Sequence, residues 1–471
     1  MKTLTLLLAL ALTGCMIGPD YHRPDVEVPV AYREAGDWKP AEPGDGFPRG
    51  NWWEIYGDSE LNSLVAQVEI SNQNIAAAAA QYRQALALLG VAEAGYFPTL
   101  GAGLDVGRGQ GSSPSSSIGT STVTPGSPIY NIVRPTLNAN WEPDIWGKIG
   151  RNVESSQASA QASQSDLKSA LLSAQGTLVQ SYFQLRINDE TQRLLRQTSD
   201  AYQRSLQITR NRYAAGVASR VDVAMAETQL QSTQAQAIDL GVQRAQLEHA
   251  IAVLIGKPPA ELKIKPVDGL PALPAVPPGL PSALLERRPD IAGAERRMAA
   301  ANAQIGVAQG AFFPALTLSA TGGYQDSSFS QLFTLPNRFW SVGSSLAMTV
   351  FNGGAFSAQK DAAIASYDAS VATYRQTVLS AFQEVEDNIA ALRELAAETT
   401  AQDAATRYAA EALALTQNQY LAGTVSYLNV VTAQATALGA QQTSLNITGR
   451  RLLANTALIK ALGGNWESAA K

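Results

Sequence analysis

The chain holds one cysteine, and it stands where acylation chemistry would need it. Cys15 ends a Leu-Thr-Gly-Cys tetrapeptide, and a largely apolar run from Leu4 to Leu12 precedes it. Small residues before a cysteine at this distance from the start are typical of a bacterial lipoprotein box, in which the cysteine becomes the acylated first residue. We expect residues 1–14 to be removed and Cys15 to carry N-palmitoyl and S-diacylglycerol chains. The alternative is an ordinary signal peptide followed by a chance cysteine.

The residue after the cysteine bears on the destination of such a lipoprotein. Met16 follows Cys15, whereas an aspartate there usually retains a lipoprotein in the inner membrane, so we expect the outer membrane. Beyond the first dozen residues no apolar run approaches the roughly 18 residues that a membrane-spanning helix needs. If this chain crosses a membrane, β-strands must do so.

Few other side chains could do chemistry together. His22 and His249 are the only histidines, one near the start and one in a predicted helix, which argues against a catalytic or metal-binding pair. No Gly-x-Ser-x-Gly motif occurs, and residues 254–257 lack the glycine loop of a phosphate cradle. The formal net charge of −5 argues against nucleic-acid binding. We therefore expect no enzyme, no cofactor, no metal site and no nucleic-acid partner.

The elements that would position any site occur twice along the chain. Residues 72–100 align without gaps onto 288–316, and residues 206–226 align onto 413–433. Identical pairs include Gly90/Gly306, Phe97/Phe313, Pro98/Pro314, Tyr213/Tyr420, Gly216/Gly423 and Ser219/Ser426. The sequence thus predicts a signal peptide (1–14), a lipid-anchored segment (15–57), a first repeat (58–257), a proline-rich connector (258–281), a second repeat (282–464) and a tail (465–471).

Each repeat predicts a helix and then two strands, at 98–107, 131–142, 315–325 and 338–350. The side chains alternate strictly, as where Leu137 and Ala139 interleave with Thr136, Asn138 and Asn140. Strands of about ten residues cross a bilayer when tilted. Aromatic residues near the strand ends fit an interfacial girdle, namely Phe97, Trp141, Trp146, Phe313, Trp340 and Phe351. The alternative is a soluble sheet with one wet face.

Two very long helices follow the strands in each repeat, at 151–215 and 219–256 and at 356–421 and 426–462. Apolar residues recur at three-and-four spacing, as in a coiled-coil seam. A helix of about 60 residues is about 90 Å long, which suits a rod across the periplasm better than a globular core.

The number of strands predicts an oligomer. Four strands in an open sheet would leave unsatisfied edge amides and carbonyls in lipid. Two chains would supply eight strands around a filled interior, and three chains would supply twelve around a wet lumen. We therefore expect a homotrimer.

Several motifs together resemble one family: Gly18-Pro19-Asp20-Tyr21 after the lipoprotein box, Arg287-Arg288-Pro289-Asp290 at mid-chain, and Ala461-Leu462-Gly463-Gly464 near the end. The chain resembles the TolC-like outer-membrane efflux factors, in the lipoprotein (NodT/OprM-like) branch that serves RND tripartite pumps. The resemblance implies a mixed α and β membrane protein, with a trimeric twelve-stranded β-barrel on a twelve-helix periplasmic α-barrel. It also implies a periplasmic adaptor, an inner-membrane RND-type transporter, surrounding outer-membrane lipid, and passive export of drugs and other small amphiphiles.

Other functions remain open on the sequence alone. A TolC-like duct could serve type I protein secretion or metal-ion efflux. A lipid-anchored coiled-coil scaffold without a pore is the alternative outside transport, although the alternating strands count against it.

A repeated Tyr-x-x-Gly element interrupts each pair of long helices and predicts a helical hairpin. One interpretation is a structural turn without a role in docking. The functional interpretation makes these turns the periplasmic tips that dock the adaptor, through Tyr213, Gly216, Val217, Ser219, Tyr420, Gly423, Thr424 and Ser426.

The resemblance also places a gate at these tips. Family members often carry acidic residues at the positions of Asn429 and Thr432, whereas this chain has neutral residues there. It keeps Asp222 in the first copy, with Arg220 beside it. Our hypothesis is a periplasmic gate made by polar links of Asp222 and Arg220 together with apolar closure.

Overall fold

The structure is a computed structural model that describes residues 16–25, 28–29, 31–33, 51–110, 129–274, 276 and 287–464. Cys15, the predicted signal peptide, the predicted tail and much of the predicted connector therefore lie outside the described residues. The chain forms two compact units. The first comprises Met1–Pro24, Arg83–Ala162 and Glu295–Ala372, and the second comprises Asp25–Tyr82, Ser163–Ala294 and Thr373–Lys471.

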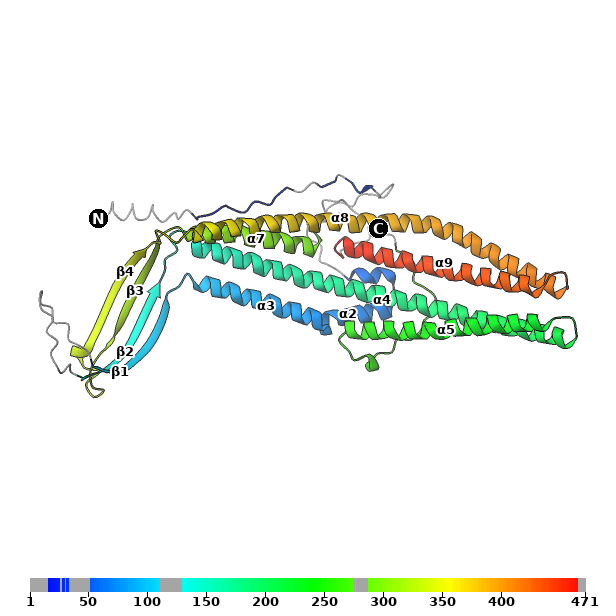
Figure 1. Ribbon diagram of the computed structural model, residues 1–471, viewed down its shortest axis with the longest axis horizontal. Helices are drawn as coiled ribbons and strands as arrows, with labels where there is room; N and C mark the ends of the chain where they lie inside the picture. Colours follow the sequence, from blue (N-terminus) through cyan, green and yellow to red (C-terminus); the bar gives the residue numbers. More distant parts are fainter. Residues whose placement is uncertain are drawn as a thin grey trace. The chain divides into compact units, whose positions relative to one another are not determined.

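The first unit contains a four-stranded antiparallel sheet in the order β1-β2-β3-β4 (Figure 1). The strands are β1 (Thr99–Gln110), β2 (Ile129–Trp141), β3 (Ala315–Tyr324) and β4 (Arg338–Ala347). The pairing register places Ala102, Leu137, Gly322 and Trp340 in one row across all four strands. Residues in such a row share one face of the sheet.

The register extends the alternation of the single strands into two contrasting faces. One face carries large apolar side chains. On β3 these are the half-buried Leu316 and Leu318, whereas those of the other three strands are exposed in the single chain: Leu100, Leu104, Val106, Leu137, Trp340, Val342 and Leu346. The opposite face carries mostly small and polar residues, as in the row Gly101, Asn138 and Thr321, where Thr321 Oγ1 lies 3.0 Å from Asn138 Oδ1. A sheet with one wet face and one exposed apolar face differs from a soluble sheet, whose apolar face is covered.

The last strand is shorter than predicted. The alternation extended it to residue 350, but β4 ends at Ala347, which pairs with Ala315 at the start of β3. Pro314 precedes Ala315 and has no amide hydrogen to continue the ladder. Residues beyond Ala347 therefore have no strand partner on β3.

The predicted first helix of the first repeat is two helices, α2 (Ser59–Ser71) and α3 (Gln73–Ala94). The break lies at Asn72, whose side-chain amide donates to the carbonyl of Leu254 at 2.7 Å. Its side-chain oxygen accepts from the backbone N–H groups of Asn74 and Ile75, at 2.9 and 3.2 Å. Asn72 therefore caps the start of α3 as well as ending α2.

The long helices are α4 (Lys148–Ala214), α5 (Arg220–Leu254), α8 (Ala355–Leu421) and α9 (Tyr427–Ala461), and the helix α7 (Pro289–Gly310) opens the second repeat. α4 begins three residues before the predicted start because the Asp144 carboxylate accepts from the N–H groups of Ile149 and Gly150 at 2.9 and 2.7 Å. Short 3-10 turns lie at Trp52–Tyr56, Pro259–Glu261 and Leu335–Asn337. In the part of the chain that the structure describes, each helix is too short or too polar to span a membrane.

The mid-chain Arg-Pro-Asp motif joins three helices of the second unit. The Arg288 guanidinium forms a bidentate pair with Asp290, at 3.1 and 2.7 Å, and contacts Glu384 on α8 at 2.6 Å. It also donates to the carbonyl of Ala461 at the end of α9, at 3.1 Å. Burial alone would raise the pKa of Asp290, but the Arg288 pair outweighs it and holds that pKa below its usual range. This motif is therefore a structural junction.

Candidate functional site

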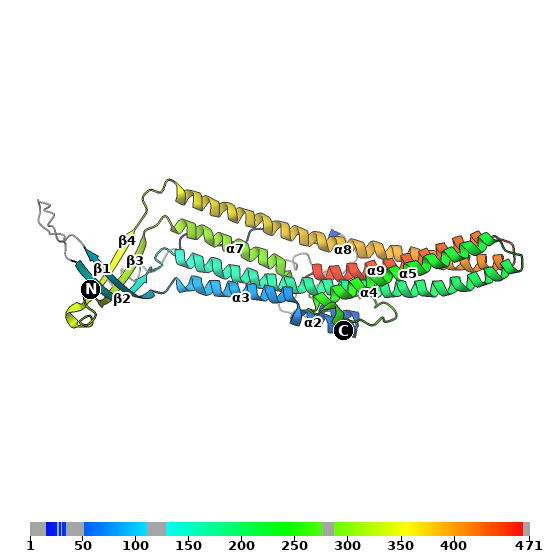
Figure 2. The ribbon, with the colours of Figure 1, turned by 60° about the horizontal axis from the view of Figure 1, so that its bottom comes forward.

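The second unit ends in two helical hairpins, which we call the first hairpin (α4–α5) and the second hairpin (α8–α9). Figure 1 shows α4 beside α5 and α8 beside α9 as they approach their turns, and Figure 2 shows α5 beside α9. Gly216 and Gly423 adopt positive φ angles of 76° and 78°, which glycine tolerates at little cost. Their amides donate to the carbonyls of Tyr213 and Tyr420 at 2.9 and 3.0 Å. The repeated sequence thus builds the same turn twice.

The helices that leave the two turns are capped differently. In the first hairpin the Ser219 hydroxyl accepts from the N–H of Asp222 at 3.1 Å, and the Asp222 carboxylate accepts from the N–H of Ser219 at 2.9 Å. These reciprocal bonds form a capping box. In the second hairpin Ser426 has the same place but makes no side-chain cap bond, and Asn429 stands where Asp222 stands in the first. Here Thr424 turns its hydroxyl back to the carbonyl of Gln419 at 3.0 Å.

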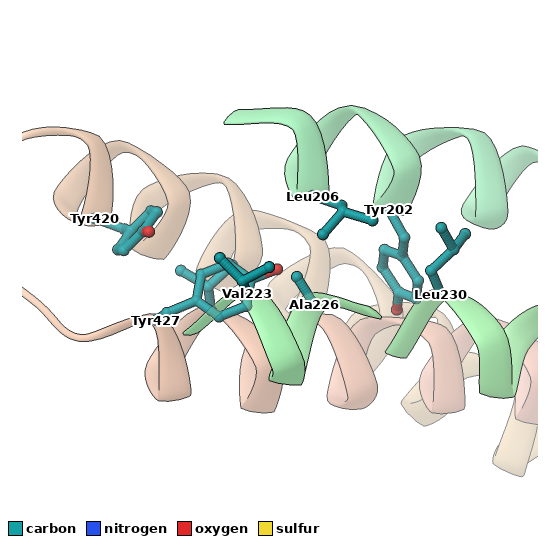
Figure 3. Packing of buried hydrophobic residues seen from close by; sticks show 8 residues of the cluster. Tyr202, Leu206, Val223, Ala226, Leu230, Tyr420 and Tyr427 are labelled. Carbon is teal, nitrogen blue, oxygen red and sulfur yellow. The ribbon is translucent and has the colours of Figure 1, made fainter. Parts of the chain in front are cut away.

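The hairpins pack on each other through one apolar cluster near the turns, which we call the tip cluster (Figure 3). Within it the rings of Tyr420 and Tyr427 meet edge to face, with centroids 5.2 Å apart. Such aromatic pairs stabilise packing beyond the area that they bury. The members are Tyr202, Leu206, Val223, Ala226, Leu230, Tyr420, Tyr427 and Val430.

Polar contacts join the hairpins around the tip cluster. Arg212 on α4 lies over the ring of Tyr420, 4.8 Å from its centroid, and donates to the carbonyl of Leu421 at 3.1 Å. The phenol of Tyr202 donates to the carbonyl of Gln434 at 3.2 Å. The hydroxyls of Ser205 and Tyr427 lie 3.3 Å apart. The last turn of α8 is therefore held by α4 as well as by its own hairpin.

The predicted gate residues do not form these links. Arg220 is exposed, and the Asp222 carboxylate serves the capping box; among the described residues of one chain no ion pair joins the two. Asn429 and Thr432 are exposed, and the Thr432 hydroxyl donates to the carbonyl of Leu428 at 3.0 Å. Within a chain the polar contacts between the hairpins come from Arg212, Tyr202 and Ser205 on α4. A link of Asp222 or Arg220 between chains stays a prediction.

The adaptor-docking residues lie at or beside the two turns. Tyr213 and Val217 of the first hairpin are exposed, as are Thr424 and Ser426 of the second. Tyr420 is the exception, because it is buried in the tip cluster. Its phenolic oxygen has no hydrogen-bond partner within the described residues.

Sequence reasoning missed Arg212, Tyr427 and the pair of Arg210 with Glu227. Arg210 lies 2.8 Å from Glu227 and joins α4 to α5. This hydrogen bond holds the pKa of Glu227 below its usual range. A signal was available in the aligned repeats: Arg212 aligns with Gln419, and Tyr427 aligns with Arg220. Positions where the two copies differ mark contacts that only one hairpin makes.

The predicted girdle residues lie in the first unit, and most of them flank the end of the sheet that connects to the helices. The indole N–H of Trp146 donates to the carbonyl of Pro314 at 2.7 Å, and its ring lies 5.2 Å from that of Phe313. The indole of Trp141 donates to the carbonyl of Tyr96 at 2.9 Å. Phe97 and Phe351 are exposed beside them, whereas Trp340 lies near the opposite end of the sheet.

Comparison with known proteins decides what this combination of sheet and hairpins is. The family model described as outer membrane efflux protein matches residues 64–257 and 280–464. The chain belongs to that family. The pyoverdine export outer membrane protein OpmQ of Pseudomonas aeruginosa is 32% identical over 99% of this chain and 98% of its own length. The cation efflux system protein CusC of Escherichia coli is 28% identical over 99% of each chain.

The solved structures agree. The outer-membrane channel OprN superposes with a TM-score of 0.89 at 31% identity, over 96% of this chain and 100% of that chain. The predicted fold class is confirmed, since the protein is an α and β outer-membrane channel subunit with four strands and long paired helices per chain. Its predicted function as an efflux exit channel is likewise confirmed at the level of the family.

Proposed function

We propose that three copies of this chain form the passive outer-membrane exit duct of an RND-type tripartite pump that exports drugs and other small amphiphiles, without catalysis by the chain itself. The observation that carries this proposal is the sheet of the first unit. Its apolar face carries exposed apolar side chains on β1, β2 and β4, and its two outer strands, β1 and β4, each have one unpaired edge within the chain. Lipid would cover the face, but only another strand can satisfy the edges there.

Pairing β4 of one chain with β1 of the next satisfies both edges and closes a ring. Three chains give twelve strands, and the small and polar face then lines the lumen. The trimer is tested by native mass spectrometry of the detergent-purified protein. Three chains are expected, and a stable monomer would contradict the proposal.

The lipid anchor is supported by the chain just after Cys15. The Arg151 guanidinium on α4 holds this segment, since it donates to the carbonyls of Ile17 and Gly18 at 3.0 and 3.2 Å and pairs with Asp20 at 2.8 Å. A Cβ on Gly18 would lie 2.5 Å from the Cα of Gly306 on α7, so the two backbones touch. The first described residues after Cys15 are thus held on α4 and α7 of the first unit, so acylation of Cys15 would anchor that unit.

The hairpins supply the periplasmic contacts. We place the adaptor on the exposed residues of both turns, and we place closure of the duct at the tip cluster, where Arg212 holds the second hairpin against the first. The similar proteins do not point to a single cargo, because one is named for pyoverdine and another for cations. A passive duct touches cargo loosely, so selection belongs mainly to the transporter.

Deleting the gene and measuring growth inhibition by dyes, detergents, antibiotics and metal ions tests the proposal. We expect hypersensitivity to several unrelated amphiphiles, restored by the intact gene, with Cys15→Ala restoring less if the lipid anchor matters. Hypersensitivity to metal ions alone would indicate that the cargo is metal cations instead of amphiphiles. Unchanged susceptibility together with missing secreted proteins would replace the drug duct with a protein-secretion duct.

A further inference from the structure

The apolar face of the sheet has a hollow, which reaches the ends of β3 and β4 remote from the long helices. A cavity of about 670 Å³ lies there, bordered by residues of all four strands and of the loop between β3 and β4. Its cause is visible in the register: Gly322 stands between Leu137 and Trp340 in one row and contributes no side chain. The hollow is therefore walled by an indole on one side and a leucine on the other.

The loop between β3 and β4 builds the outer rim of the hollow. Phe333 packs on Tyr324 at the end of β3, with ring centroids 5.3 Å apart and an interplanar angle of 67°. Asn337 braces the loop, because its amide donates to the Asp326 carboxylate, to the carbonyl of Gln331 at 2.9 Å and to the hydroxyl of Thr334 at 3.1 Å. Asp326 also bridges to Val133 on β2 through two backbone bonds of 2.8 and 3.1 Å. The aromatic rim is therefore held by a network of hydrogen bonds.

One cation stands at this rim. Arg338 pairs with Tyr324 in the sheet register, so it shares the apolar face, and it borders the cavity. It is exposed, and among the described residues no carboxylate forms an ion pair with it. Arg134 offers a contrast on the opposite face, where its guanidinium lies 4.9 Å from the ring centroid of Phe339.

We propose that this hollow binds a phosphorylated, acylated lipid of the outer leaflet, namely lipopolysaccharide, with a phosphate on Arg338 and acyl chains between Leu137 and Trp340. The proposal rests on the proposed function, which sets this face in lipid. Arginine recognises phosphate by paired, charge-assisted hydrogen bonds, and an aromatic rim belongs at the headgroup level of a bilayer. β2 and β4 lead into α4 and α8 at the other end of the sheet, and the proposed function sets those helices in the periplasm, so the loop between β3 and β4 would meet the outer leaflet.

Native mass spectrometry of the delipidated trimer, titrated separately with lipid A, phosphatidylglycerol and inorganic phosphate, tests the site. We expect the wild-type trimer to retain lipid A at lower concentration than phosphatidylglycerol, and free phosphate not to compete. Losing a charged hydrogen bond should weaken lipid A retention by about tenfold in Arg338→Ala. Arg134→Ala is the matched control, since it removes the same charge from the opposite face of the same sheet and should leave retention unchanged.

Three outcomes would overturn the site: equal retention by Arg338→Ala and wild type, equal loss in both variants, or equal binding of lipid A and phosphatidylglycerol. Bilayer conductance and rescue of the deletion strain are measured on the same wild-type and Arg338→Ala proteins. A wild-type trimer that conducts and rescues the deletion strain but does not bind lipid A would contradict the lipid site and leave the proposed function intact. A wild-type protein that neither conducts nor rescues the deletion strain would contradict the proposed function.

Discussion

The two hairpins of the second unit have the same turn and different supports. In the first hairpin, the capping box of Ser219 and Asp222 and the ion pair of Arg210 with Glu227 lie within the hairpin itself. In the second, Ser426 makes no cap bond, and the residue after it, Tyr427, is buried against the other hairpin. The duplication thus preserved the turn but divided the roles. Both hairpins contribute to the tip cluster, but the first has a capping box of its own, whereas the start of α9 in the second is buried against the first.

The largest effect is expected for Tyr427→Ala. The Tyr427 side chain is only 2% exposed, and replacing a buried aromatic residue with alanine costs about 3–5 kcal/mol. Amide hydrogen exchange should therefore accelerate strongly in the first turns of α9. The control is Arg220→Ala at the aligned, exposed position of the first hairpin, which should leave exchange nearly unchanged. Equal acceleration of exchange in Tyr427→Ala and Arg220→Ala would contradict the predicted difference between the hairpins.

Loss of a helix cap should change amide exchange less than Tyr427→Ala does, and it should affect the first hairpin more than the second. Ser219→Ala removes a capping-box hydroxyl that stabilises the helix by about 1 kcal/mol, and it should raise exchange at the start of α5. Ser426→Ala removes no cap bond and should change the start of α9 by at most a few tenths of that. Exchange of both segments by mass spectrometry checks this, and a larger effect at Ser426 would contradict the assignment.

The smallest effect is a dependence on pH in the first hairpin. The bond from Arg210 lowers the folded-state pKa of Glu227, so its stabilisation is complete above the unfolded pKa of about 4.3 and is lost as pH falls through the folded pKa. After correction for intrinsic rates, exchange near Glu227 should be constant from neutral pH down to about 5 and should rise below about 4. Glu227→Gln should remove this pH dependence of exchange. If the pH dependence persists in that variant, another titrating group causes it.

Local patterns predicted most of the fold. Strands follow from the period-two alternation of residues such as Thr136 and Leu137, because neighbouring side chains point to opposite faces. The turns follow from Gly216 and Gly423, whose conformation only glycine adopts easily. Each of these signals lies within a few residues, so a single stretch of sequence contains it.

The features that sequence did not predict depend on contacts between distant residues. Asn72 breaks the first helix by bonding to a carbonyl 182 residues away, and Arg212 reaches a carbonyl 209 residues away. No local pattern tells which copy of a repeat will contact the other. The cap of Ser219 and Asp222 is different, because a Ser-x-x-Asp pattern is local and typical of a capping box, and the gate hypothesis overlooked it.

Single-channel conductance of the purified trimer in planar bilayers tests most directly whether the tip contacts hold the duct closed. Arg212→Ala and Arg210→Ala remove the same charge two residues apart on α4, but only Arg212 reaches the second hairpin. We expect Arg212→Ala to open to several times the conductance of the wild type and Arg210→Ala to match the wild type. Equal conductance of all three proteins would contradict closure at the tip cluster.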